Sequence, residues 1–110
     1  MAVMEISIVP IGKGASISTY VADCVRVLKK EKMPFELSSM GTNVEGSLKN
    51  LIAVALKMHQ VPFNKGAQRV VTTIKIDDRR DKKVTIAGKK KAVQQKLLVR
   101  SLESCEQFRR

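Results

Sequence analysis

The sequence predicts an α+β fold with four strands and two helices in the order βαββαβ, followed by a basic C-terminal helix. Apolar and polar side chains alternate in the segments that begin at Met4 and Phe35, a pattern typical of half-buried strands. Apolar residues recur at helical spacing in residues 17–28 and 48–55. Residues 70–76 are rich in β-branched side chains, which favour a further strand. This order is the split-βαβ, ferredoxin-like arrangement, an antiparallel sheet with both helices on one side.

The first strand and the first helix have plausible ends in the sequence. The first strand covers residues 4–8, and Pro10 ends it. Ser16 or Ser18 can cap the helix that follows, because a serine hydroxyl accepts a hydrogen bond from a free backbone N–H of the first turn. Pro34 then stops this helix, since proline cannot continue the backbone hydrogen bonding.

A hairpin and a second helix follow. Residues 35–38 predict the second strand, Met40 and Gly41 the turn, and residues 42–45 a short third strand. Ser47 can cap the second helix, which residues 64–66 end. The expected apolar face of that helix is Leu48, Leu51, Ile52 and Ala55, with His59 at its edge.

Right-handed crossovers place the first and third strands in the centre of the sheet. The alternation then divides the strand residues between the two faces of the sheet. The side facing the helices should carry Ile6, Ile8, Phe35, Leu37, Val44, Ile74 and Ile76. The open face should carry Glu5, Ser7, Glu36, Ser38, Asn43, Glu45, Arg69, Val71, Thr73 and Lys75. A rigid, uncovered and polar face predicts a binding site or a subunit interface, unless the basic tail folds back over part of it.

The charge is concentrated in one half of the chain. The formal net charge is +11, yet residues 1–50 hold six Lys or Arg against five Asp or Glu, and residues 51–110 hold fifteen against five. The basicity therefore belongs mainly to the end of the chain. We expect a core in residues 1–82 and, in the same domain, a basic helix and tail in residues 83–110, with the helix starting at about Val84. A solvated helix face is the favoured explanation of the charge, and contact with a polyanion is the alternative.

Several classes of protein are disfavoured by the sequence. The longest apolar run, residues 51–56, is far shorter than the roughly 20 residues of a membrane span. There is no basic leader segment, and Cys24 and Cys105 do not suggest a disulfide framework, so we expect a cytoplasmic protein. A single histidine gives no metal-ligand spacing, and no nucleophile–base pair or cofactor loop is present, so we expect no enzyme activity, metal or cofactor. Aromatic residues are 4% of the chain, too few for a base-stacking RNA platform.

The run from Met40 to Gly46 is the main candidate site. Two glycines bracket Thr42 and Glu45, a hydroxyl and a carboxylate on one short strand. Polar groups on a rigid element are typical of a ligand pocket. The alternative for Glu45 is a salt bridge to Arg69 or Lys75 on the fourth strand.

Several stretches together resemble the small thiamine-binding, YkoF-like proteins. The resemblance covers about residues 3–98 and no single motif in it is decisive. The matching stretches are residues 8–12, 16–18, 20–22, 40–42, 45–46, His59, 69–70 and 72–82. The family implies a ferredoxin-like protomer that forms dimers, often tetramers, and that binds thiamine or its hydroxymethylpyrimidine moiety without catalysis.

Mapped onto this chain, the resemblance implies a set of ligand-binding residues. They are Ser18, Gly41, Thr42, Glu45, Gly46, Arg69 and Thr73. Asn43 stands where members usually carry an aliphatic residue, and residues 99–110 extend past the usual end.

The sequence therefore favours a non-enzymatic binder of thiamine or a related pyrimidine at a homo-oligomer interface. In that hypothesis Glu45 and Thr42 bind the aminopyrimidine, Thr73 adds a hydrogen bond, and the flanking glycines permit close approach. Two alternatives stay open. The open face could serve self-association alone, or residues 79–100 could bind nucleic acid.

Overall fold

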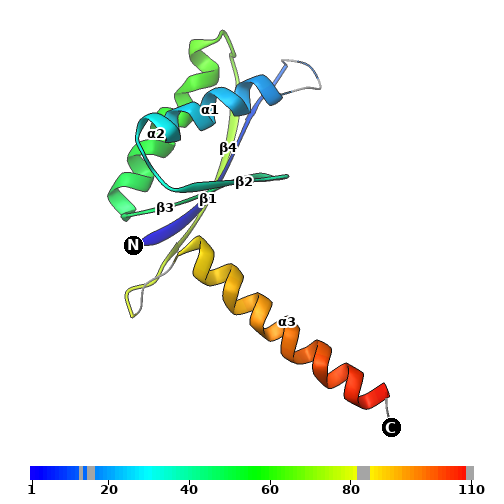
Figure 1. Ribbon diagram of the computed structural model, residues 1–110. Coiled ribbons are helices and arrows are strands. Elements are labelled where there is room, and N and C mark those ends of the chain that lie inside the picture. The colour runs from blue at the N-terminus through cyan, green and yellow to red at the C-terminus, as the bar shows by residue number, and fades with distance from the viewer. Residues whose placement is uncertain (13, 15–16, 82–84, 109–110) are drawn as a thin grey trace.

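The computed structural model describes residues 1–12, 14, 17–81 and 85–108, with side chains as far as residue 98. Figure 1 shows two helices packed on one side of a sheet, and a third helix that projects away from it. The elements in chain order are β1 (Ala2–Pro10), α1 (Ser18–Lys30), β2 (Phe35–Ser38), β3 (Gly41–Gly46), α2 (Leu48–Asn64), β4 (Val70–Asp78) and α3 (Ile86–Phe108). The predicted α+β, ferredoxin-like fold and its C-terminal helix are confirmed.

The sheet has the strand order β2-β3-β1-β4, and every neighbouring pair is antiparallel. The first and third strands are therefore central, as expected. Met4 of β1 lies between Val44 of β3 and Ile76 of β4, so these three side chains share the face that the helices cover. Glu5 lies between Asn43 and Lys75 on the opposite, open face.

The core fills the space between the helices and the covered face. Its buried members are Ala2, Met4, Ile6, Ile8, Cys24, Leu28, Val44, Leu51, Val54, Ala55 and Met58. They alternate along the strands and recur every three or four residues along the helices, as the sequence pattern predicts.

Three details of the sequence prediction need correction. The N-cap position of α1 is Ile17, and Ser18 is the first helical residue; Ser16 lies outside the described residues. The buried face of α2 is turned from the expected one, because Val54 and Met58 are buried while Leu48 and Ile52 are 39% and 44% exposed. The tight turn of the hairpin is residues 39–40, and β3 begins at Gly41.

The start of α2 agrees with the prediction. The Ser47 hydroxyl accepts a hydrogen bond from the Asn50 N–H at 3.2 Å, which is the expected cap of α2. Val84, the expected start of the last helix, lies outside the described residues. Within the described residues no helix is long and apolar enough to cross a membrane.

Candidate functional site

A cleft of about 830 Å³ opens between α1, the later part of β1 and the β2–β3 hairpin. It lies on the covered side of the sheet, where α1 packs mainly against α2 and leaves the hairpin partly uncovered. Its principal wall residues are Ile8, Ile17, Ser18, Val21, Cys24, Val25, Arg26, Lys29, Leu37, Met40, Gly41 and Thr42. The volume falls within the range of roughly 300–1,000 Å³ found for small-molecule sites.

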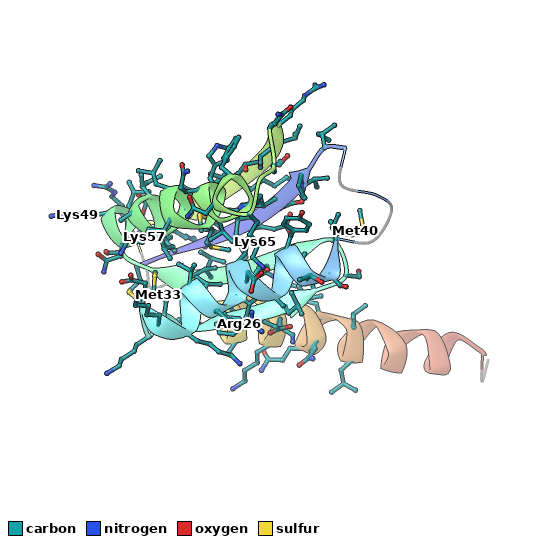
Figure 2. The ribbon with its side chains drawn as sticks, turned by 90° about the horizontal axis from the view of Figure 1, so that it is seen from above. Arg26, Met33, Met40, Lys49, Lys57 and Lys65 are labelled. Atoms are coloured by element: carbon teal, nitrogen blue, oxygen red, sulfur yellow. The ribbon has the colours of Figure 1, made fainter. Side chains whose placement is uncertain are left out.

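Apolar side chains at the cleft are left exposed by the fold. Leu37 is on the edge strand β2 with 57% of its surface exposed, and Met40 in the turn is 83% exposed. Figure 2 shows Met40 at the same end of the molecule as the start of α1, and Met33 at the opposite end. An apolar wall that the chain itself does not cover can receive a flat, apolar ring.

Thr42 of β3 and Ser18 of α1 are two of the polar residues of the cleft wall, which also includes serines of β1 and of the β2–β3 hairpin. Thr42 pairs with Ile6 in the sheet, so its side chain faces the helices, and only 5% of its surface is exposed. Gly41 precedes it, and a methyl group there would lie 3.1 Å from the Ile6 carbonyl oxygen. Ser18 adds an exposed hydroxyl from the first turn of α1. The cleft therefore combines an apolar wall with hydroxyl groups from several elements.

Arg26 and Lys29 supply the charges among the described residues of the cleft wall, and these residues include no carboxylate. Arg26 also pairs with Asp23, which in turn pairs with Lys65 near the end of α2. Figure 2 shows Arg26 on α1 and Lys65 where α2 ends. The hydrogen bond from Lys65 is the main cause that lowers the pKa of Asp23, so this carboxylate stays ionised and joins the two helices.

Cys24 lies at the base of the cleft but is poorly suited to react. Its Sγ atom is 3.6 Å from the Met58 carbonyl oxygen, and the residue is buried. Burial, and secondarily the negative charge of Asp23, raise the pKa of the thiol to about 11. A thiol with that pKa is protonated at neutral pH, and the thiolate is the nucleophilic form.

The structure separates the predicted site residues. Ser18, Gly41 and Thr42 meet at the cleft. Glu45 is three positions from Thr42 on the same strand, so its side chain projects from the opposite face. Thr73 is also on that open face, since it pairs with Ser7, two positions from Glu5.

The residues on the open face do not form one small site either. Val3 of β1 pairs with Glu45, and Ser7 pairs with Thr73. Four residues of a strand span about 13 Å, so Glu45 and Thr73 are too far apart to contact one small molecule at a single ring.

The remaining two predicted residues lie elsewhere. Gly46 packs below the helices, where an added methyl group would lie 3.0 Å from Met33. Arg69 precedes β4, and its carbonyl oxygen accepts a hydrogen bond from the Ile11 N–H at 2.8 Å.

Glu45 contacts the chain's own C-terminal helix. Its Oε2 atom accepts a hydrogen bond from the Ile86 N–H at 2.9 Å, while the Thr85 hydroxyl accepts one from the Gly88 N–H at 2.9 Å. Two of the free N–H groups at the start of α3 are thereby satisfied. Sequence reasoning missed this role, although Thr85 before a helical stretch was an available capping signal.

Ion pairs fix the first turns of α3 at the edge of the open face. Lys90 binds Glu36 at 2.9 Å, and Lys89 binds Asp77. A second cavity of about 440 Å³ lies beneath this contact, beside Glu45. The basic segment thus covers one corner of the open face and then extends beyond the sheet (Figure 1).

The structure gives the surroundings of possible metal ligands and of His59 within its described residues. The described residues contain no group of three His, Cys, Asp or Glu side chains able to hold a metal ion. His59 Nδ1 lies 2.7 Å from the Thr72 hydroxyl, and its ring packs edge-on against Phe63. These contacts give His59 a structural role between α2 and β4.

Comparison with known proteins identifies the family. The family model described as "Thiamine-binding protein" matches residues 4–94. The chain belongs to this family. The protein YqgV of Bacillus subtilis, of the group named UPF0045, is 43% identical over 102 residues, which cover 88% of this chain and 98% of that protein.

Solved structures agree with the fold of this family member. A hypothetical protein of Methanocaldococcus jannaschii has a TM-score of 0.80 at 42% identity, over 84% of this chain and 95% of that chain. A Thermotoga maritima protein described as a putative thiamine biosynthesis/salvage protein has a TM-score of 0.68 at 19% identity, over 80% and 92% of the two chains. The second likeness is evidence of the fold alone.

Proposed function

We propose that this family member is a non-enzymatic binder of thiamine or a related hydroxymethylpyrimidine, and that the ligand occupies the α1–hairpin cleft. The observation that carries the proposal is the cleft itself, in which Thr42 and Ser18 accompany an uncovered apolar wall. Membership of a thiamine-binding family supports the ligand class.

The chemistry of an aminopyrimidine suits this cleft. Its flat ring can pack against Leu37 and Met40, and its ring nitrogens and amino group need hydrogen-bond partners. A threonine or serine hydroxyl can both donate and accept, so Thr42 and Ser18 can serve either kind of group. Gly41 lines the cleft with its backbone, since a side chain at this position would point to the open face beside Glu5. Among the residues expected from the family resemblance, we therefore assign Ser18, Gly41 and Thr42 to the ligand.

Calorimetry tests the proposal with a pair of matched variants. Thr42→Val removes the hydroxyl inside the cleft, and Thr73→Val makes the same change on the opposite face of the sheet. We expect binding of hydroxymethylpyrimidine or thiamine to weaken about tenfold in Thr42→Val, the loss of one hydrogen bond at a buried polar group, and to be unchanged in Thr73→Val.

Two results would contradict the assignment. Absence of heat with either ligand at millimolar concentration, with the protein folded, would remove the proposed function. Loss of binding in Thr73→Val alone would move the ligand to the open face.

A second candidate function is self-association through the open face and α3, giving a homodimer or homotetramer. Val93, Leu97 and Leu98 of α3 are each more than half exposed, and Val71 of β4 is 45% exposed. A helix with such an exposed apolar surface gains stability when a partner covers it. A second copy of the chain is the proposed partner.

The exposed apolar residues favour a second copy over a polyanion as that partner, because a polyanion would contact the basic side chains and leave Val93, Leu97 and Leu98 uncovered. Lys89 and Lys90 of α3 already bind acidic groups of the same chain at the edge of the open face, which reduces the positive charge that a second copy would meet there. Sedimentation of Leu97→Glu against the control Lys96→Glu tests the proposal. We expect the oligomer to dissociate in Leu97→Glu and its sedimentation coefficient to change less in Lys96→Glu. A wild-type protein that sediments as a monomer at all concentrations would refute self-association.

A further inference from the structure

The cleft has an uneven charge distribution that bears on its ligand. Arg26 and Lys29 lie three positions apart on α1, hence on one side of the helix, and both belong to the cleft wall. Arg26 has 73% of its side-chain surface exposed, so its guanidinium lies at the mouth rather than in the core. The carboxylates Glu36 and Glu45 lie on the opposite face of the sheet, where α3 binds them.

The neighbouring carboxylate does not neutralise this mouth. Asp23 pairs with Arg26 but also with Lys65, so these three groups together keep one positive charge. Lys29 adds a second positive charge. The mouth of the cleft is therefore net positive, while its inner wall is apolar and hydroxyl-bearing.

These charges discriminate between related pyrimidines. Thiamine carries a permanent positive charge on its thiazolium ring, and two cations at the mouth oppose its entry. A phosphate monoester carries close to two negative charges at neutral pH and offers three acceptor oxygens. An arginine can bind such a group with two parallel hydrogen bonds, and a lysine can bind it as a point charge.

We propose that the preferred ligand of the cleft is an anionic aminopyrimidine, a hydroxymethylpyrimidine that carries a phosphate monoester. The ring lies between Thr42 and the apolar wall, and the phosphate lies at the mouth with Arg26 and Lys29. This inference rests on the proposed function, because it names the ligand class of the same cleft.

Calorimetry with four compounds tests the inference on the whole chain of residues 1–110. The compounds are hydroxymethylpyrimidine, its phosphate ester, thiamine and inorganic phosphate. We expect the phosphate ester to bind at least tenfold more tightly than hydroxymethylpyrimidine and thiamine to bind more weakly than both. Raising the salt concentration should weaken the binding of the phosphate ester much more than the binding of the uncharged alcohol. This measurement needs no variant.

A matched pair of double variants locates the effect. Arg26→Gln/Lys29→Gln should abolish the tenfold preference for the ester and strengthen the binding of thiamine. Lys49→Gln/Lys96→Gln removes the same charge from exposed positions on α2 and α3 and should keep the preference. Circular dichroism checks that both variants fold.

The possible outcomes separate the inference from the proposed function. Equal or tighter binding of the uncharged alcohol or of thiamine would overturn the inference and leave the proposed function standing. Inorganic phosphate that binds as tightly as the ester would show an adventitious ion only and would also overturn it. If none of the three pyrimidines binds, both the inference and the proposed function fail.

Discussion

Replacing Glu45 by alanine should release the C-terminal helix from the sheet without unfolding the core. The Glu45 carboxylate accepts a hydrogen bond from the Ile86 N–H at 2.9 Å, at the positively polarised end of α3. Loss of a helix-capping acceptor costs about 0.5–2 kcal/mol, and loss of a carboxylate at a helix start about 0.3–1 kcal/mol. Because the Thr85 hydroxyl still caps Gly88 in the variant, we expect a combined cost of about 1–2 kcal/mol.

This cost should fall on the docking of α3 alone. The described side chains of α3 are nearly all exposed, so the helix contributes little to the core. A cost of about 1–2 kcal/mol raises the opening equilibrium of α3 about 5- to 30-fold. Amide hydrogen exchange followed by NMR measures that equilibrium residue by residue. We expect faster exchange in α3 and unchanged exchange in β1 and β3.

Two further variants calibrate the result. Glu45→Gln keeps a hydrogen-bond acceptor without the charge and should speed amide exchange in α3 less than Glu45→Ala does. Glu36→Ala removes the ion pair with Lys90, in which the Glu36 and Lys90 side chains are 43% and 56% exposed. We therefore expect the opening equilibrium of α3 to rise only about twofold. Unchanged α3 exchange in Glu45→Ala, or an effect no larger than that of Glu36→Ala, would refute the capping role.

Three other predictions concern the helices and the cleft. Asp23→Asn should destabilise the protein at pH 7, because the Lys65 hydrogen bond lowers the pKa of the native carboxyl below its ordinary value of 3.8. That stabilisation is present above the pKa of the unfolded chain and is lost as pH falls through the lower native pKa. The free energies of unfolding of variant and wild type, measured in urea, should therefore converge in strong acid. A constant difference at every pH would contradict this role of Asp23. Gly41→Ala should lower the free energy of unfolding in urea by about 1–3 kcal/mol, since its methyl group meets the Ile6 carbonyl oxygen at 3.1 Å; a variant as stable as wild type would show that β3 shifts freely. Cys24, with its pKa raised to about 11, should resist iodoacetamide at pH 8 in the native protein and react once urea unfolds it, as mass spectrometry of the Cys24 peptide can show; rapid native alkylation would contradict its burial.

The sequence predicted the fold because local patterns and chain topology agree. Alternation along β1 and β3, helical spacing in α1 and α2, and the cap at Ser47 each follow from short-range rules. Errors arose where tertiary packing overrides those rules. The face of α2 that is buried depends on where α1 lies beside it, so Val54 and Met58 replace Leu48 and Ile52 in the core.

The candidate site was predicted only in part. Strand periodicity by itself places Thr42 and Glu45 on opposite faces of the sheet. The prediction that both residues bind one ligand is inconsistent with this alternation. The role of Glu45 could not be obtained from periodicity, because its partner Ile86 is 41 residues away in the chain. The same is true of the cleft, which exists because α1 packs against α2 and leaves the hairpin uncovered.

The sequence by itself therefore determined the strand order, the two faces of the sheet, the family and the basic last helix. These properties depend on side-chain period, chirality of the connections and composition, all of which are readable along the chain. Only the tertiary structure decided which hydroxyl groups share a cleft, which charges line its mouth and what Glu45 binds. Those facts depend on distances between elements, and the packing of helices on the sheet sets these distances.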